Sequence, residues 1–163
     1  MTLDAKLLRE LLHYDSASGV FTRLVASGRH GCHRAGQTIG GPNGHGYTLI
    51  GVNGTRYRAH HLVWLYVHGE WPSAVMDHIN GDRTDNRLSN LRVASLAINA
   101  QNIRVPKSHN KSGFLGVSRF RDKWQASITV GGVSRNLGVF TTPESAHAVY
   151  LEHKRVLHLG CTI

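Results

Sequence analysis

The sequence predicts an α+β protein made of two small domains, a first one over residues 1–103 and a second one over residues 113–160, joined by a basic linker at 104–112. Three observations support this prediction. Eighteen glycines in 163 residues favour many turns and short strands over long helices. Residues 75–102 read as strand, polar loop, strand and helix, and the C-terminal part reads as three strands followed by one helix.

The first domain begins with helical and hairpin signals. Leucines at helical spacing predict a helix over Leu3–His13, and Gly19–Thr22 reads as a short strand. The β-rich runs Tyr47–Val52 and Thr55–Arg58 flank an Asn-Gly pair, which is the strongest short-range signal for a hairpin. His60–His68 then predicts a helix that ends at a glycine.

A ββα unit is predicted at the end of this domain. Its first short strand is expected around Val75–His78, followed by a polar loop at Asn80–Asn90. A second short strand follows at Leu91–Val93, and a helix starts near Ser95.

Beyond the linker the sequence pattern becomes that of consecutive β-strands. Phe114–Phe120, Lys123–Val130 and Ser134–Phe140 read as strands, and their short connections predict hairpins and hence an antiparallel sheet. A helix opens at Thr142, with Pro143 at its first position. The second domain is therefore predicted as a small three-stranded antiparallel sheet packed on one helix.

The charge balance predicts a polyanionic partner. Nineteen Lys and Arg against ten Asp and Glu give a formal net charge of +9, and neutralised phosphates release counterions that favour binding. A basic surface kept only for solubility is the alternative. No apolar run approaches the ~20 residues that cross a bilayer, and the N-terminus is charged where a signal peptide is apolar. We therefore expect a soluble, cytoplasmic protein with duplex DNA as its partner and no membrane partner.

The two cysteines, Cys32 and Cys161, lie far apart in the sequence and form no C-x-x-C pair. This excludes a disulfide framework and a four-cysteine zinc site. Residues 26–46 read as a long exposed loop or irregular hairpin that carries His30, Cys32, His33 and His45. Because their spacing is irregular, exposed loop residues are favoured over a metal site, and the role of this cluster stays open.

The segment 77–92 holds the residue types that phosphodiester hydrolysis needs. The reaction requires a water made nucleophilic and a cation that neutralises charge on the phosphorane and the leaving oxygen. A neutral imidazole suits the first task. Carboxylate and amide oxygens suit a hard cation such as Mg²⁺, which keeps most of its waters. The alternative is that Asp77 and His78 form a turn pair, with the asparagines as loop and cap residues.

This segment resembles the zinc-free branch of the HNH endonucleases of phage and mobile introns. The resemblance is carried by Asp77-His78-Ile79-Asn80-Gly81-Asp82, Asp85-Asn86-Arg87, Asn90-Leu91-Arg92, Asn99 and Asn102. It implies a ββα-metal fold in which His78 is the general base and Asp77 and Asn99 ligate Mg²⁺ or Mn²⁺, with no structural zinc. Asn90 would tie the ββ loop together so that His78 is oriented, and His60 matches the family's upstream histidine.

The C-terminal residues resemble the APETALA/ethylene-response-factor DNA-binding domain. The matching residues are Ser112-Gly113-Phe114-Leu115-Gly116-Val117, Lys123-Trp124-Gln125-Ala126, Leu137-Gly138-Val139-Phe140 and Ala146-His147-Ala148-Val149-Tyr150. The resemblance implies a sheet that lies in the major groove, with its helix behind. Strand alternation can place Arg119, Arg121, Trp124 and Arg135 on one exposed face. The alternative is that Trp124 belongs to the core and the arginines form a solvated face.

Together these patterns predict a metal-dependent endonuclease that cuts or nicks duplex DNA, a site-directed or homing-type enzyme of a phage or mobile element that is located in the cytoplasm of a phage-infected or bacterial host cell. The residues expected to contact DNA are Arg58, His60, Arg83, Arg87, Arg104, Lys107, Lys111, Arg119, Arg121, Lys123, Trp124 and Arg135. One site per chain favours a monomer that nicks one strand. The alternative is a non-catalytic, sequence-specific DNA-binding protein or regulator on a decayed nuclease scaffold.

Overall fold

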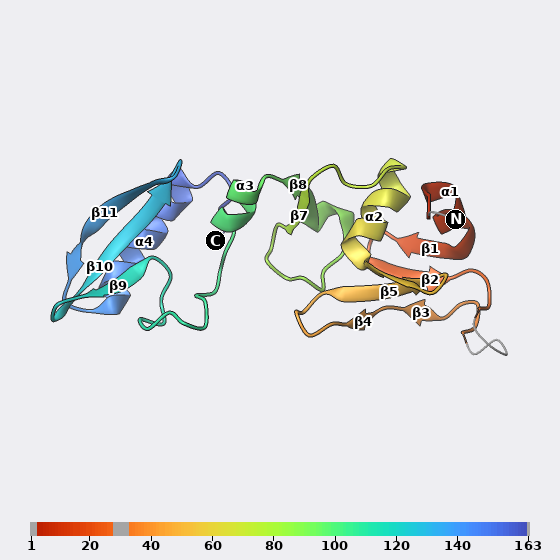
Figure 1. Cartoon of the computed structure of the whole chain (residues 1–163), viewed down its shortest axis with the longest axis horizontal. Helices are drawn as coiled ribbons and strands as arrows, with labels where there is room; N and C mark the ends of the chain where they lie inside the picture. Colours follow the sequence, from red (N-terminus) through yellow and green to blue (C-terminus); the bar gives the residue numbers. More distant parts are fainter. Residues whose placement is uncertain (1–2, 28–32, 163) are drawn as a thin grey trace. The chain divides into compact units, whose positions relative to one another are not determined.

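A computed structural model describes residues 3–27 and 33–162 of the chain. In these residues the protein is α+β, with four α-helices and several small antiparallel sheets (Figure 1). The helices are α1 (Ala5–Leu11), α2 (Ala59–His68), α3 (Leu96–Gln101) and α4 (Pro143–Leu157). The strands are β1 (Leu12–Asp15), β2 (Val20–Arg23), β3 (Thr38–Ile39), β4 (Gly41–Pro42), β5 (Thr48–Val52), β6 (Thr55–Arg58), β7 (Val75–His78), β8 (Leu91–Ala94), β9 (Val117–Phe120), β10 (Lys123–Val130) and β11 (Val133–Phe140).

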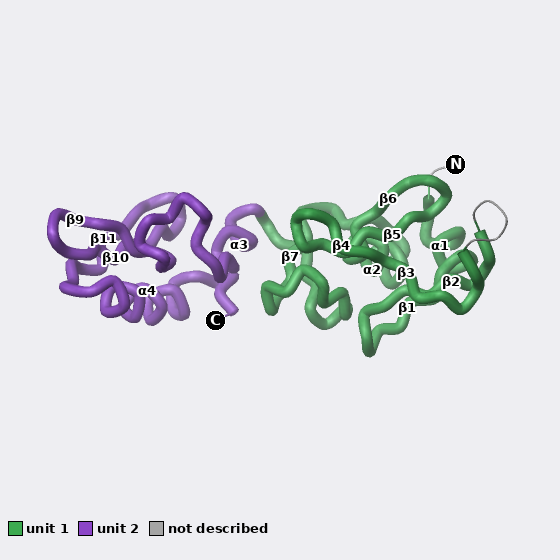
Figure 2. Tube along the Cα trace, turned by 90° about the horizontal axis from the view of Figure 1, so that it is seen from below, with its two compact units in different colours: residues 1–95 green, residues 96–163 purple. Residues whose placement is uncertain are grey.

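The chain forms two compact units, residues 1–95 and residues 96–163 (Figure 2). The division lies before α3, whereas the sequence suggested a boundary at residue 103. Helix α3 therefore belongs to the second unit by its contacts, although the sequence assigned it to the ββα unit of the first domain.

The N-terminal helix is shorter than its leucine pattern predicted. Asp4 caps α1 by accepting a hydrogen bond from the Leu7 amide at 2.8 Å. The helix ends at Leu11, because Leu12–Asp15 pairs with β2 as an antiparallel strand that buries alternate residues. Leu12 is thus a core residue of a strand rather than of the predicted helix.

The hairpin prediction is confirmed by β5 and β6. Their turn places Asn53 and Gly54 at positive φ angles of 49° and 80°, as a tight hairpin turn requires. Ile50 and Val52 point into the core of the first unit, where residues from α1, β1, β2, α2, β7 and β8 also meet. The predicted exposed loop before this hairpin contains the two short strands β3 and β4.

The second unit has the predicted order of three strands and a helix. Its sheet order is β11-β10-β9, with both strand pairs antiparallel. Thr142 caps α4 by accepting from the Ser145 amide at 3.2 Å, and Pro143 occupies its first turn. The helix packs through Ala146 on Val117 and Ala126 of the sheet, which form a small core.

Candidate functional site

The strands β7 and β8 carry the predicted reactive pair. In their antiparallel register Asp77 lies opposite Arg92, and His78 lies opposite Leu91. Both Asp77 and His78 are buried, at 7% and 4% exposure. The strand pair therefore holds an acid and an imidazole, adjacent in sequence, inside the first unit.

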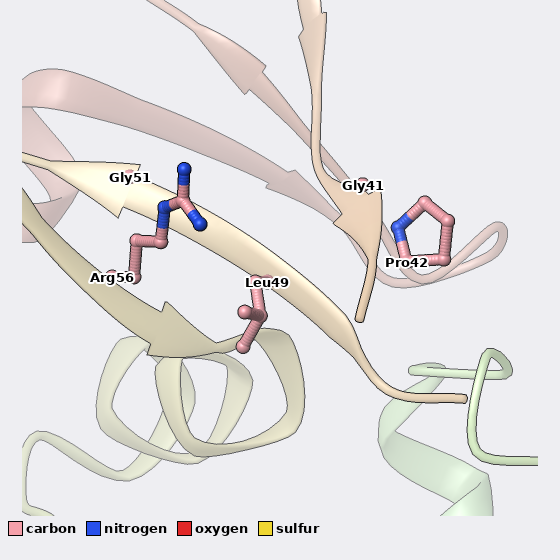
Figure 3. Close-up of a pocket in the computed structure, with 5 residues that line it drawn as sticks. All are labelled: Gly41, Pro42, Leu49, Gly51 and Arg56. Carbon is pink, nitrogen blue, oxygen red and sulfur yellow. The ribbon is translucent and has the colours of Figure 1, made fainter. Parts of the chain in front are cut away.

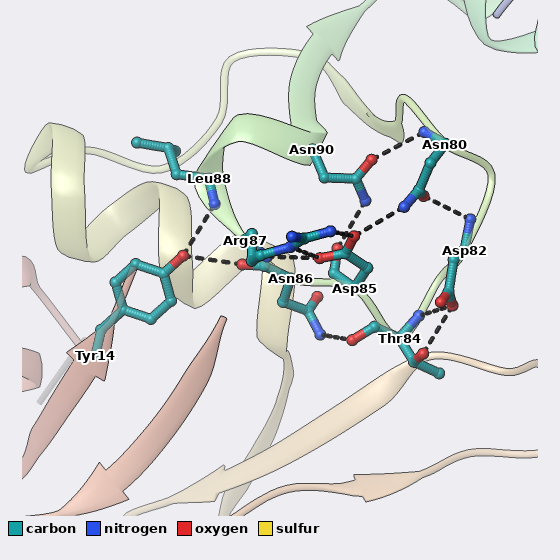
Figure 4. Close-up of polar contacts among 9 residues, drawn as sticks. All are labelled: Tyr14, Asn80, Asp82, Thr84, Asp85, Asn86, Arg87, Leu88 and Asn90. Atoms are coloured by element: carbon teal, nitrogen blue, oxygen red, sulfur yellow. Dashed lines mark hydrogen bonds and ion pairs between the residues drawn. The ribbon is translucent and has the colours of Figure 1, made fainter. Parts of the chain in front are cut away.

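The Asn90 side chain bridges the loop that joins these strands (Figure 4). Its Oδ1 accepts from the Asn80 amide at 2.8 Å, and its Nδ2 donates to the Asp85 carbonyl at 2.8 Å. Its own carbonyl accepts from the Ile79 amide at 2.8 Å, one residue after His78. These bonds fix the backbone that leaves β7 and so restrict where the His78 side chain can lie.

Further side-chain hydrogen bonds connect the rest of the loop (Figure 4). Asn80 Oδ1 accepts from the Asp82 amide at 2.8 Å, and Asn80 Nδ2 donates to Asp85 Oδ2 at 2.8 Å. Arg87 donates to both carboxylate oxygens of Asp85, at 2.8 and 2.6 Å. The hydrogen bonds from Arg87 lower the pKa of Asp85 to about 2. Arg87, a predicted DNA contact, is thus engaged in an ion pair within the loop.

Tyr14 and Gly19 lie against this loop from the N-terminal hairpin, and no pattern in the sequence indicated either residue. The Tyr14 hydroxyl donates to the Asn86 carbonyl and accepts from the Leu88 amide, each at 3.0 Å. A side chain at Gly19 would meet the Arg87 amide nitrogen at 2.5 Å. Both contacts span more than sixty residues of sequence, so only the fold brings these groups to the loop.

Two aromatic rings lie beside the imidazole of His78. The ring centroids of His60 and Tyr47 lie 4.9 and 6.1 Å from that of His78, and His60 also lies 4.6 Å from His61. His60 is 2% exposed. Burial, reinforced by the neighbouring His61, His78 and Arg58, lowers the pKa of His60 to about 3. His60 is therefore a neutral core residue against His78 at neutral pH.

The imidazole of His78 is also kept neutral. Burial lowers the pKa of His78, and the Asn86 side chain together with the charges of Asp77, Asp82 and Asp85 opposes this effect only in part. A neutral imidazole can accept a proton. His78 thus has the protonation state that a general base requires at neutral pH.

Two arginines stack on Tyr47, a residue that the sequence reasoning missed. The guanidinium carbons of Arg58 and Arg83 each lie 4.9 Å from the centroid of the Tyr47 ring. Arg83 also donates to the His45 carbonyl at 2.9 Å. The ring therefore gathers two predicted DNA contacts, from β6 and from the β7–β8 loop, beside His78.

Asp77 is the carboxylate expected to bind a cation. Its Oδ2 accepts from Nε and Nη2 of Arg92 at 3.0 and 2.7 Å. In the described part of the chain no group of three or more His, Cys, Asp or Glu side chains is arranged to hold a metal ion. Mg²⁺ needs only one or two protein ligands. Asp77 can supply one carboxylate oxygen of the kind that a hydrated Mg²⁺ ion accepts.

Asn99, the second expected ligand, lies on α3 in the second unit. Its convergence with Asp77 stays a prediction. Of the predicted site residues in the first unit, Arg58 and Arg83 lie on Tyr47 and His60 lies against His78. Arg87 and Asn90 share the hydrogen-bonded β7–β8 loop, whereas Asp77 pairs with Arg92.

The register of the second sheet differs from the expected open face of arginines. Trp124 pairs with Arg119, whose guanidinium lies 4.9 Å from its ring, and packs against the core beneath α4. Arg135 pairs with Ile128, which is 2% exposed. Because paired residues share a face, both arginines lie on the helix-facing side with exposed side chains. This favours the core interpretation of Trp124.

The remaining basic residues vary in their surroundings. Arg104 donates to the carbonyl and the hydroxyl of Thr162, which ties the linker to the C-terminal segment. Lys107, Lys111, Arg121 and Lys123 are exposed. DNA contact by these residues stays a prediction.

The histidine and cysteine cluster falls partly outside the described residues, because His30 and Cys32 lie there. His33 is exposed and pairs through its backbone with Ser27, and His45 lies exposed in the turn before β5. Among the helices that the structure describes, none is long and apolar enough to cross a membrane.

Comparison with known proteins identifies two similarities. Residues 57–101 match the model of a family described as HNH endonuclease. The chain is also 37% identical over 82 residues to Protein 3.8 of Escherichia phage T7, across 48% of this chain and 67% of that relative. No solved structure matches the chain significantly. The matched family region includes His60, Asp77, His78, Asn90 and Asn99.

Proposed function

Because the chain belongs to the family of phage T7 Protein 3.8 and contains an HNH endonuclease domain at residues 57–101, we propose that it is a metal-dependent endonuclease that hydrolyses phosphodiester bonds in duplex DNA. The observation that carries the proposal is the buried Asp77-His78 pair at the end of β7, inside the matched region. A phage homologue also favours a role in the cytoplasm of the host cell.

His78 acts as the general base in this proposal. Its burial keeps the imidazole neutral, so it can take a proton from the attacking water at neutral pH. The Asn90 bonds to Asn80 and Asp85 orient the imidazole by fixing the loop that follows β7. His60, packed edge-on at 4.9 Å, limits the rotation of the ring.

The guanidinium groups on Tyr47 bind the phosphate. Arg58 and Arg83 are exposed and share one aromatic platform next to His78. Such groups attract the scissile phosphate and favour the additional charge of its transition state. Asp77 and Asn99 would hold the divalent cation, which when bound neutralises charge on the phosphorane and the leaving oxygen.

The second unit grips the DNA. Its exposed Lys107, Lys111, Arg121 and Lys123, together with Arg119 and Arg135, supply positive charge, and Asp122 is the one acidic residue between positions 104 and 135. With one site per chain, a monomer nicks one strand, and a site-directed or homing-type activity follows if the second unit reads sequence.

Incubation of the full-length chain with supercoiled plasmid tests the proposal. We expect conversion to the open circle with Mg²⁺ or Mn²⁺ and none with EDTA. Plasmid that is bound but not nicked under every metal condition would reject the nuclease and leave the alternative, a non-catalytic DNA-binding protein.

A further inference from the structure

The outer face of the β5–β6 hairpin carries a row of arginines. Ile50 and Val52 point into the core, so Leu49 and Gly51 point outward. Arg58 pairs with Leu49 and Arg56 pairs with Gly51. The two arginines therefore stand on the same outer face, ~6.8 Å apart along the strand.

A hollow lies beneath Arg56 on this face (Figure 3). It measures about 260 Å³ and is lined by Gly41, Pro42, Leu49, Gly51 and Arg56. A side chain added at Gly41 or Gly51 would meet no atom within 4 Å, so these glycines leave the floor open. The hollow is therefore open to a ligand group that contacts the Arg56 guanidinium.

A second hollow of about 420 Å³ shares Gly51 and Arg56 with the first and adds Arg23. Arg23 is held there by bonds to Ser27 Oγ at 2.7 Å and to the Gly51 carbonyl at 3.3 Å. No acidic residue lines either hollow, and in the described part of the chain no carboxylate forms an ion pair with Arg56. Two cations without a neighbouring anion favour an anionic ligand.

The row is continuous with the candidate active site. Arg58, the next outward residue after Arg56, stacks on Tyr47, which also carries Arg83 and lies 6.1 Å from His78 by ring centroids. Arg83 and Arg58 share Tyr47, Arg56 follows Arg58 on the outer face of β6, and Arg23 lines the hollow that adjoins Arg56.

We propose that Arg56, with Arg23 behind it, binds the DNA backbone that flanks the reactive phosphate, so that the outer face of β4–β5–β6 is a phosphate track. This rests on the proposed nuclease function. Apart from Arg56, the first hollow is lined by glycine, proline and leucine, which offer no hydrogen-bonding side chain to a base edge, so we expect the track to contact phosphates rather than bases.

Salt dependence of DNA binding tests the track. Binding of a labelled duplex is measured by anisotropy over a series of salt concentrations, in the full-length His78→Ala chain so that no cleavage occurs. Arg56→Gln should reduce the slope of log K against log salt by about 0.9 and weaken all sequences alike, as loss of one phosphate contact does. Arg56→Lys should retain the slope.

Two matched pairs make the result specific. Gly51→Glu places a carboxylate beside Arg56 and should reduce the slope, whereas Gly51→Ala should not. Lys6→Gln removes one exposed charge from α1, outside both hollows, and should leave the slope unchanged. Unfolding temperatures show whether each variant is folded. If Arg56→Gln does not fold, the comparison of Gly51→Glu with Gly51→Ala decides whether the track exists.

An unchanged slope in Gly51→Glu, or an equal reduction in Lys6→Gln, would overturn the track. Plasmid nicking by the wild-type chain is scored separately. If the wild type binds DNA without nicking it, the nuclease proposal fails while the slope comparison still decides whether the track exists.

Discussion

The β7–β8 loop of the first unit and the sheet of the second unit both present polar and basic side chains, yet different forces fix them. The loop is held by side-chain hydrogen bonds centred on Asn90 and Asp85, over an extensive buried core. The sheet is held by a few small apolar contacts around Ala126 and Ala146, and its arginines stand at the margins. A polar network holds its side chains in one arrangement, as catalysis requires. Binding a phosphate backbone requires only exposed positive charges near the sheet.

Removing the centre of the polar network should have the largest effect on the folded state. Asn90→Ala leaves the Asn80 amide and the Asp85 carbonyl without their partner, which should cost about 2–5 kcal/mol of unfolding free energy. Denaturant unfolding measures the loss, and nicking should fall with it. The exposed neighbour Ser89→Ala is the control. An Asn90→Ala chain of wild-type stability would contradict the assignment of the loop to hydrogen bonding.

Acid should destabilise the first unit through His60. Its folded pKa of about 3 lies below the unfolded value of 6.5, so the unfolded chain binds more protons between these values. The contribution of His60 to the unfolding free energy is therefore fully present above pH 6.5, and the unfolding free energy falls by about 1.4 kcal/mol per pH unit below that pH. His61 and His78 contribute with the same sign, because their pKa values are also lowered.

Unfolding free energy measured between pH 7 and ~4.5 reports the combined effect of the buried histidines, since the carboxylates titrate lower. His60→Gln should reduce the pH slope, while the exposed His13→Gln should not. An identical slope in wild type and His60→Gln would show that His60 is not a buried neutral group.

A substitution of Trp124 tests whether this residue belongs to the core of the second unit or contacts DNA. If it belongs to the core, Trp124→Ala should cost about 2–4 kcal/mol and lower the unfolding temperature of the second unit. Phe120→Ala, on the opposite face and 45% exposed, should cost less. Weaker DNA binding by Trp124→Ala at unchanged stability would instead support a direct contact of the indole with DNA.

The stack on Tyr47 should have the smallest effect. Tyr47→Leu removes the platform of Arg58 and Arg83 and should weaken binding by about 1 kcal/mol, roughly fivefold in KM for DNA. Tyr47→Phe retains the ring and should retain KM. A fall in kcat alone, without a change in KM, would mean that Tyr47 acts on His78 rather than on the phosphate-binding arginines.

Local patterns predicted much of the fold. The Asn53-Gly54 turn, the β7–loop–β8 order and the Thr142 cap each depend on neighbouring residues, so the sequence contained them. The end of α1 at Leu11 was not predicted, because the helical spacing of the leucines continues through Leu12, and only the pairing of Leu12 with β2 makes it a strand residue. Which face of the second sheet carries the arginines was also not predicted, because a register shift at Ala126 and the position of α4 decide it.

Most of the candidate-site residues that the sequence indicated belong to one contiguous segment. Asp77 and His78 end β7 and Asn90 precedes β8, so all three follow one motif within residues 77–92. Tyr14, Gly19 and Tyr47 reach that loop from the N-terminal strands and turns, and nothing in their own neighbourhoods indicates this contact. Tertiary packing therefore adds the supporting residues. Their contacts are what separate a buried, oriented His78 from a histidine in an exposed turn.

The most direct test of the account is plasmid nicking by His78→Ala beside His13→Ala, with DNA binding measured for both. If the buried, neutral imidazole removes the proton from water, His78→Ala should nick about 10²- to 10⁴-fold more slowly, with duplex affinity unchanged and His13→Ala active. A His78→Ala chain that nicks as fast as the wild type would contradict the assignment of the base.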